Sequence, residues 1–287
     1  MTLTLSRSAR PAAIHSHQLG EHTITYLPDG LALLEPDAWL PDSDEQVWTD
    51  HAHLINDDGY LVASVGALLI EHRGRTMLID AGFGPLAVPT AVGLLRGGQL
   101  LDSFAAAGKN PADVELIAIT HLHMDHIGWL WAHPPDHTRS PFADTPVVVG
   151  HAEWEHPELA AADGTPAEVL DIFAHQVRTI GSGEEVFPGV TTMATPGHSL
   201  GHTSYLIESS GRRLIAFGDA LTTPAQITHP HLTTVADDEP ALARATAMRL
   251  LDELTRPDTL GFGVHFADLQ LGRITTNSDG QRTWQPE

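Results

Sequence analysis

Three histidines and an aspartate are concentrated in one short stretch of the chain, THLHMDHIG at residues 120–128. Imidazole nitrogen and carboxylate oxygen are common metal ligands. His121 and His123 are separated by one residue, so in an extended or loop backbone their side chains can converge on one ion. Asp125 and His126 continue the same loop and could serve a second ion. Because the chain has 19 histidines, a solvated His-rich loop is the alternative interpretation.

Three further polar residues stand at the ends of apolar runs elsewhere in the chain. His198 follows a Pro-Gly turn in TPGHSLGH, Asp219 closes LIAFGDA, and His265 follows LGFGV. Each run can place one nitrogen or carboxylate ligand at the tip of a strand. This recurrence favours a metal site over a solvated loop. Since the chain has no cysteine, its ions must bind nitrogen and oxygen, which suits Zn²⁺ and also Mn²⁺, Co²⁺ or Fe.

The segments that carry these residues predict strands alternating with helices. Two apolar runs flank Arg73-Gly74-Arg75 and predict a hairpin that is buried on both faces. A helix ending near Gly108 is followed by the strand ELIAIT, which leads directly into the His-rich loop. TPVVVGHAEW predicts a strand and then a helix, residues 190–221 predict three short strands, and DDEPALARATAMRLLDEL predicts a long helix. Chemistry is therefore expected at strand ends in a layered α/β fold.

Residues 1–57 form an N-terminal segment with weaker patterns. EHTITYLPDG predicts a short strand closed by a Pro-Asp-Gly turn, and EPDAWLPDSDEQVW predicts an acidic loop. Neither a signal peptide nor a membrane span is evident, so a cytoplasmic location is expected. We expect one domain over 1–287, with 1–57 as an N-terminal extension and 58–275 as the core.

Composition limits the kinds of partner that the chain can bind. The formal net charge is −22, from 37 acidic and 15 basic residues. Such a surface repels phosphate backbones and anionic lipids, so we expect neither nucleic acid nor membrane as a partner. A small neutral or cationic molecule suits this field better. The absence of cysteine also excludes disulfides and a cysteine nucleophile.

The order H-x-H-x-D-H, Gly-His, Gly-Asp and a late His resembles the metallo-β-lactamase superfamily of metal-dependent hydrolases, over residues 57 to 275. The resemblance implies an αββα sandwich of two pseudo-repeated halves with two divalent ions, zinc first. His121, His123 and His198 would hold one ion, Asp125, His126 and His265 the other, and Asp219 would bridge them. Asp80 in LIDAGFG would not bind an ion itself but would orient one of the ligands. His202 would support the loop.

The same resemblance implies a mechanism. Two ions ~3.5–4 Å apart bind a bridging water and lower its pKa towards neutrality, so that hydroxide attacks the substrate. Asp125 would orient this hydroxide and pass a proton to the leaving group, which makes it the catalytic residue.

Several features narrow the substrate class. Asp219 argues against a true β-lactamase. Enzymes of the glyoxalase II type carry a C-terminal helical domain with basic residues, whereas only about 20 residues follow His265 in this sequence and few of them are basic. The C-terminal stretch from ALARATAM to LGRI is similar to the methyl parathion hydrolase-like branch, which includes phosphotriesterases and lactone or ester hydrolases. Thr222 stands where related lactonases place a tyrosine. We therefore expect hydrolysis of small apolar esters or lactones, with phosphotriesters as the alternative and a non-catalytic metal-binding relative as the third hypothesis.

An apolar substrate groove is expected beside the ions. The candidate lining residues are Phe83, Trp129, Trp131, Thr222, Phe266 and Leu269, although ordinary core packing is an equal alternative for the apolar ones. His229 and His231 could belong to a lid or to a solvated loop. A small-molecule substrate is expected, and the apolar strands allow a homodimer.

Overall fold

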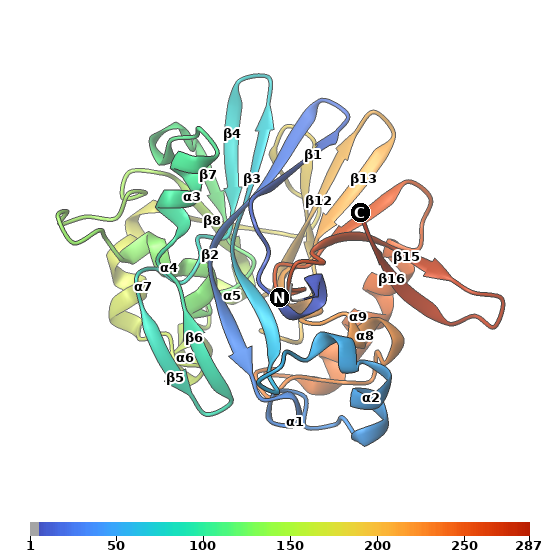
Figure 1. Cartoon of the computed structure of the whole chain (residues 1–287). Helices are drawn as coiled ribbons and strands as arrows, with labels where there is room; N and C mark the ends of the chain where they lie inside the picture. The colour runs from blue at the N-terminus through green and yellow to red at the C-terminus, as the bar shows by residue number, and fades with distance from the viewer. Residues whose placement is uncertain (1–5) are drawn as a thin grey trace, which may run out of the picture.

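A computed structural model describes residues 6–287, whose strands form two sheets packed face to face (Figure 1). Residues 1–5, the start of the segment in which no signal peptide is evident, lie outside the described residues. The first sheet has the order β5-β6-β2-β3-β4-β7-β8-β9, and β1 pairs with β2. Its strands are β1 His15–Leu19, β2 His22–Leu34, β3 Leu61–His72, β4 Arg75–Ile79, β5 Ala87–Thr90, β6 Gly93–Arg96, β7 Leu116–Ala118, β8 Val147–Gly150 and β9 Val177–Ile180.

The second sheet follows sequence order from β10 to β16. Its strands are β10 Glu185–Phe187, β11 Val190–Ala194, β12 Thr203–Ser209, β13 Arg212–Ala216, β14 Thr259–Phe262, β15 Leu271–Thr276 and β16 Arg282–Pro286. Only β13 and β14 pair in parallel in this sheet, and the long helix α9, Pro240–Leu254, lies between them in sequence. This crossover places α9 on the outer face of the sheet.

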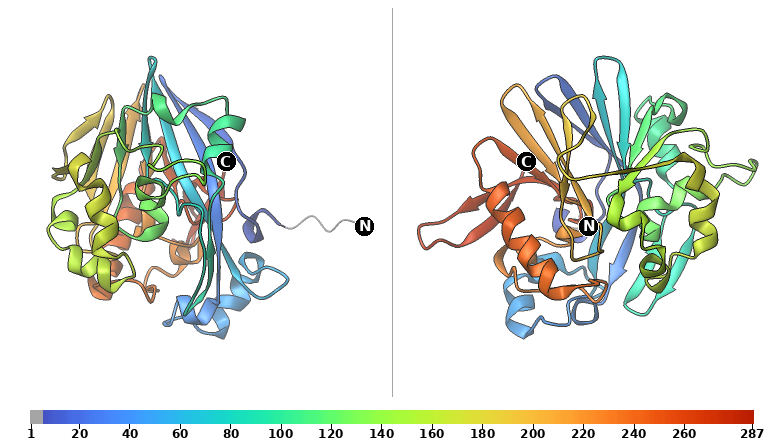
Figure 2. Two further views of the ribbon diagram at one scale, coloured as in Figure 1. Left: turned by 90° about the vertical axis from the view of Figure 1, so that its left-hand side faces the viewer. Right: turned by 180° about the vertical axis from the view of Figure 1, so that it is seen from behind.

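Hydrophobic clusters divide the molecule into four layers. One cluster fills the space between the two sheets and includes Leu68 and Ile70 from β3 and Tyr205 from β12. A second packs the outer face of the first sheet against α3 Leu100–Ala106, α4 Met124–Trp131, α6 Pro157–Ala162 and α7 Ala167–Phe173. A third packs α9 against the second sheet. Figures 1 and 2 show these helices on opposite sides of the sheets, so the αββα sandwich expected from the sequence is confirmed.

The predicted hairpin at Arg73-Gly74 is present between β3 and β4. Arg73 and Gly74 have φ values of 50° and 82°, as a two-residue type I′ turn requires. The expected burial on both faces of β3 also holds, because Leu68 and Ile70 enter the core between the sheets while Ala67 and Leu69 face the outer helices.

Two expectations for the N-terminal segment are wrong. Pro28-Asp29-Gly30 is not a turn: β2 continues through it to Leu34, with a bulge in its pairing with β3. The acidic stretch is not a plain loop but contains two short helices, α1 Pro36–Trp39 and α2 Glu45–Asp50. These helices form because Leu40 and Val47 can bury themselves against Leu232.

The bulge in β2 has a structural reason. The side chain of Asp29 is fully buried and accepts five hydrogen bonds. The donors are the backbone N–H groups of Phe83, Gly84, Gly98 and Leu100 and the indole N–H of Trp129. The inserted residue, Asp29, thus accepts hydrogen bonds from buried N–H groups of two loops and a helix, which would otherwise have no partner.

The remaining helices are α5 His151–Trp154 after β8 and α8 Ala225–Thr228 before α9. None of the helices within residues 6–287 combines the length and the apolar character that crossing a membrane requires.

Candidate metal centre

The seven candidate ligands all follow the ends of strands. His121 and His123 lie in the loop after β7, while Asp125 and His126 occupy the first turn of α4. His198 lies between β11 and β12, Asp219 follows β13, and His265 follows β14. The structure thus brings together residues from four strand ends, in both sheets, in one place.

These side chains form two adjoining groups. The nitrogens of His121, His123 and His198 lie within 4.8 Å of one another, and so do the ligand atoms of Asp125, His126 and His265. Asp219 lies between the groups. Its Oδ1 is 3.3 Å from Nε2 of His126, and its Oδ2 is 3.4 Å from Nε2 of His198.

Three of the five imidazoles are held through the nitrogen that faces away from the cluster. Nδ1 of His126 lies 2.8 Å from Oδ2 of Asp80, and Nδ1 of His198 lies 2.8 Å from Oδ1 of Asp237. The ring of His265 bonds through Nδ1 to the carbonyl oxygen of Ser64 over 2.8 Å. Such contacts fix the tautomer and leave Nε2 free for a metal ion.

The two remaining imidazoles have different partners. Nδ1 of His121 lies 3.0 Å from Oγ1 of Thr120, whose hydroxyl in turn donates to Asp80. Nε2 of His123 faces Oδ2 of Asp163 at 3.4 Å, while its Nδ1 lies 3.2 Å from Nε2 of His198. Asp163 and Asp237 were not singled out in the sequence, because single aspartates in polar loops have no distinguishing pattern.

Unsatisfied buried atoms test whether this donor set fits metal ions. Among the described residues, Nε2 of His121 and Oδ1 of Asp219 are buried and have no hydrogen-bond partner. Leaving such atoms unpaired is costly unless an ion occupies the space that they face. Five imidazoles and two carboxylates also match the nitrogen and oxygen preference of Zn²⁺. The residues present therefore fit a pair of divalent ions.

The electrostatics of the cluster agree with this donor set. Burial by itself would raise the pKa of Asp219, but the imidazoles of His265 and His126 hold that pKa well below its usual range. Burial lowers the pKa of His121, and His126 and His123 lower it further. Asp219 is thus anionic and His121 neutral, which are the forms in which these side chains can bind metal.

His202 lies beside the cluster but its nitrogens are already engaged. Its Nε2 accepts the backbone N–H of Asp219 over 3.0 Å, and its Nδ1 lies 2.8 Å from Oγ1 of Thr195. Burial and the neighbouring His198 lower its pKa to about 3. His202 therefore supports the Asp219 backbone, as expected from the sequence.

A pocket of about 360 Å³ opens directly over the cluster. Its floor includes His123, Asp125, Asp219 and His265, and Thr222 lies on its wall. Most of the remaining wall is apolar and comes from β2, α1 and the β5–β6 hairpin, with Leu34, Trp39, Val92, Leu94 and Leu95 as its larger side chains. None of the described lining residues is Lys or Arg.

The four aromatic side chains expected in this pocket all lie elsewhere. Phe83 and Trp129 are buried, and both donate a hydrogen bond to the Asp29 carboxylate, Phe83 from its backbone N–H and Trp129 from its indole N–H. Phe266 packs against α9 and β13 in the core. Leu269 packs at the edge of a cluster beneath β2 and β3. Of the expected lining residues, Thr222 is the one that lines the pocket.

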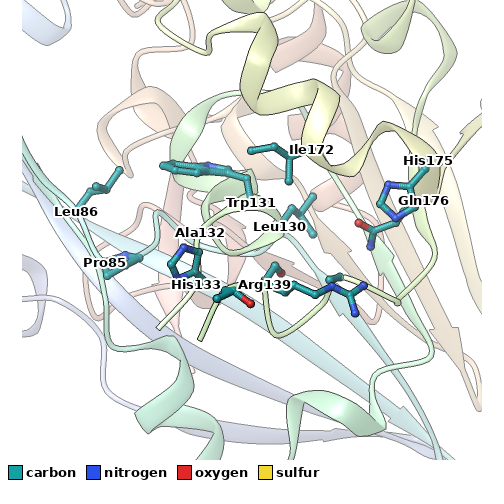
Figure 3. A pocket seen from close by; sticks show the side chains of 13 residues that line it. Pro85, Leu86, Leu130, Trp131, Ala132, His133, Arg139, Ile172, His175 and Gln176 are labelled. Atoms are coloured by element: carbon teal, nitrogen blue, oxygen red, sulfur yellow. The ribbon is translucent and has the colours of Figure 1, made fainter. Parts of the chain in front are cut away.

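Trp131 lines a different cavity, of about 550 Å³, at the other end of α4 (Figure 3). Leu130, Ile172 and Arg139 border the same cavity. The helix explains this placement, because α4 begins at the metal cluster and its last turn points away from it. The residues missed in the sequence, Trp39 and the hairpin around Val92, had no periodic pattern that marked them as a pocket wall.

Comparison with known proteins agrees with the fold. The model of the metallo-β-lactamase superfamily matches residues 63–261. An N-acyl homoserine lactonase of Bacillus cereus is 27% identical over 224 residues, which cover 72% of this chain and 83% of that protein. An N-acyl homoserine lactonase of Bacillus thuringiensis is 32% identical over 175 residues, covering 55% of this chain and 64% of the relative. The solved structure of AidC, a dizinc quorum-quenching lactonase, has a TM-score of 0.82 at 21% identity and covers 96% of this chain and 98% of its own.

Fold, donor set and relatives together define a metal-dependent hydrolase of the αββα class. The chain belongs to the metallo-β-lactamase superfamily. The resemblance inferred from the H-x-H-x-D-H motif is thereby confirmed, as is the expectation of a hydrolase.

Proposed function

We propose that the chain hydrolyses small, neutral, largely apolar esters, with lactones first. The observation that carries this proposal is the pocket over the metal cluster, whose described lining is mostly apolar and offers no Lys or Arg to pair with an anion. Apart from the metal ions, the described lining offers a phosphate or carboxylate group on a substrate no cation that would offset the negative charge of Asp163. A neutral lactone or ester would meet no such repulsion.

His121, His123 and His198 would hold one divalent ion, Asp125, His126 and His265 the other, and Asp219 both. Bound there, two ions would activate a water molecule as the nucleophile and polarise the carbonyl oxygen of the substrate. Zn²⁺ is the proposed metal, because the donors are mainly imidazoles and the similar lactonase AidC is a dizinc protein.

Asp125 is the carboxylate whose position suits proton transfer during the hydrolysis. Its Oδ2 lies 3.6 Å from Nε2 of His265 and 3.7 Å from Nε2 of His126, and its side chain is 18% exposed towards the pocket. Asp219, by contrast, is buried at 5%. We therefore assign to Asp125 the orientation of the attacking water and the delivery of a proton to the leaving alkoxide.

The apolar wall would hold the acyl part of the substrate. Trp39 is fixed there because its indole N–H donates to Oγ1 of Thr222 over 3.2 Å. Thr222 is in turn bonded to Oε1 of Gln226 through both its backbone N–H and its hydroxyl. A rigid wall of this kind orients a flexible acyl chain and excludes water from the ester carbonyl.

The relatives support the same class, since both Bacillus proteins described above are N-acyl homoserine lactonases. A neutral phosphotriester would meet the same uncharged wall and is the alternative substrate. The non-catalytic hypothesis predicts no turnover with either.

The test is proton release in a pH-stat, using protein loaded separately with Zn²⁺, Mn²⁺ and Co²⁺. The panel contains N-acyl homoserine lactones of several chain lengths, aryl carboxylic esters and one dialkyl aryl phosphotriester. We expect the lactones to give the highest kcat/KM. A preference for the triester would replace the proposed substrate class, and no turnover with any metal would support the non-catalytic hypothesis. Size-exclusion chromatography with light scattering on the same samples tests whether the chain forms the homodimer that its apolar strands allow.

A further inference from the structure

Glu153 is a buried carboxylate that the sequence analysis did not single out. It lies on α5, directly after β8, and is 6% exposed. Its side chain contacts two separate loops. Oε1 accepts the backbone N–H of Leu122 over 2.9 Å, while Oε2 accepts the hydroxyl of Ser199 over 2.7 Å and the backbone N–H of Gly201 over 2.9 Å.

These two loops carry all three ligands of the first metal group. Leu122 stands between His121 and His123, and Ser199 follows His198 directly. The loops are far apart in sequence and come from different sheets, so the Glu153 carboxylate joins them at the position where they must meet. The ligands of the second group lie on α4 and after β14, whereas these three hydrogen bonds of Glu153 all go to the two loops of the first group.

The backbone around Glu153 is built for this close approach. A Cβ atom added to Gly201 would lie 2.0 Å from the backbone N of Glu153, so any other residue there would push the His198 loop away from α5. A Cβ added to Gly150 would lie 2.5 Å from the carbonyl oxygen of Gly201. The two glycines let the loop rest directly on the start of α5.

We infer that Glu153 is a positioning residue that selectively sets the affinity of the first metal group, by fixing the His121–His123 loop against the His198 loop. The inference rests on the proposed metal centre but not on the proposed substrate. A carboxylate is needed because both of its oxygens must accept hydrogen bonds, which an amide cannot do.

The test measures metal content after dialysis against graded chelator. Glu153→Gln keeps the size of the side chain but replaces one of the two accepting oxygens by an NH₂ group, which would face N–H or O–H donors of one of the two loops. We expect it to retain one ion per chain with affinity close to the wild type and to bind the other at least about tenfold more weakly. Glu155→Gln is the matched control, because it removes the same charge from an exposed residue two positions along the chain.

Two further variants separate bridging from charge and identify the affected group. Glu153→Asp keeps the charge but is too short to reach both loops, so we expect it to behave like Glu153→Gln. His265→Ala should retain one ion, in the first group, and its combination with Glu153→Gln should weaken that ion too.

Several results would overturn the inference. The first is a Glu153→Gln variant that binds both ions with wild-type affinity, and the second is one that binds both ions equally weakly. The third is a Glu153→Asp variant that binds both ions with wild-type affinity. Equal weakening together with a lower urea midpoint of the metal-free protein would show a general structural role. A wild type that binds no metal would instead remove the proposed metal centre, and a wild type that binds two ions without lactone turnover would remove the proposed substrate alone.

Discussion

Oδ1 of Asp219 lies 3.1 Å from Nε2 of His265, while the other oxygen of the same carboxylate faces His198. The Asp219 carboxylate therefore lies close to imidazoles of both ligand groups. The backbone of Asp219 is held in place by a hydrogen bond from its N–H group to the neutral ring of His202.

We expect Asp219→Asn to lose activity by roughly 10²-fold or more, because an amide cannot offer an anionic oxygen to both ions. Metal content should fall below that of the wild type. Steady-state kinetics and metal analysis on the same sample check this, with the exposed Asp57→Asn as the control. Activity and metal content equal to those of the wild type would show that Asp219 does not bridge.

Asp29 should matter for stability more than for chemistry. Asp29→Asn would place an NH₂ group against two or three of the five buried donors, which we expect to cost about 2–4 kcal/mol of unfolding free energy. Urea denaturation measures this. Asp102→Asn, an exposed change on α3, should have little effect, and an Asp29→Asn midpoint as high as that control would contradict the role of the bulge.

Thr222 should affect substrate binding more than turnover. Its hydroxyl is engaged by Trp39 and Gln226, so we do not expect it to contact the reacting atoms. Thr222→Val should raise KM for long-chain lactones several-fold and change kcat by less than about threefold. Trp39→Phe removes the same hydrogen bond from the other side and should reproduce this pattern. A large loss of kcat in Thr222→Val would instead place the hydroxyl at the reaction centre.

His51 should make the metal-free protein sensitive to mild acid. Burial and the nearby His229 lower the pKa of His51 to about 4, from 6.5 in an unfolded chain. Because the unfolded state binds this proton more readily, the stabilisation is complete above about pH 6.5 and is lost as the pH falls towards 4.

His51→Gln retains a donor towards Thr228, which lies 2.8 Å from the imidazole, but does not titrate. We expect the variant to lose less stability than the wild type between pH 7 and pH 4.5, by on the order of 1–2 kcal/mol. Urea titrations with chelator present measure the difference at each pH. Parallel pH profiles for the two proteins would show that His51 is not responsible.

The gathering of the candidate metal ligands could be predicted from the sequence because they follow apolar runs, and strand ends gather at one edge of a layered fold. The pocket wall could not. Trp129 and Trp131 lie close to the ligands in sequence, but α4 turns Trp129 towards Asp29 and Trp131 towards the far cavity. The direction of a side chain on a short helix depends on which neighbours cover that helix, and those neighbours come from distant parts of the chain.

The Pro-Asp-Gly segment illustrates the same limit. These three residues favour a turn, yet the strand continues because Asp29 pairs with buried donors from the loops around Phe83 and Gly98. Local preference is overridden by partners more than 50 residues away.

The contact between His265 and the carbonyl oxygen of Ser64 has a consequence for the order of folding. The two residues are 201 positions apart, and the contact joins the last ligand of the cluster to the strand at the centre of the first sheet. Because His126 follows β7 of the first sheet and His265 follows β14 of the second, the second group of ligands is complete only when the two sheets have docked. In the proposed metal centre, binding of an ion to that group would therefore require that the two sheets have docked.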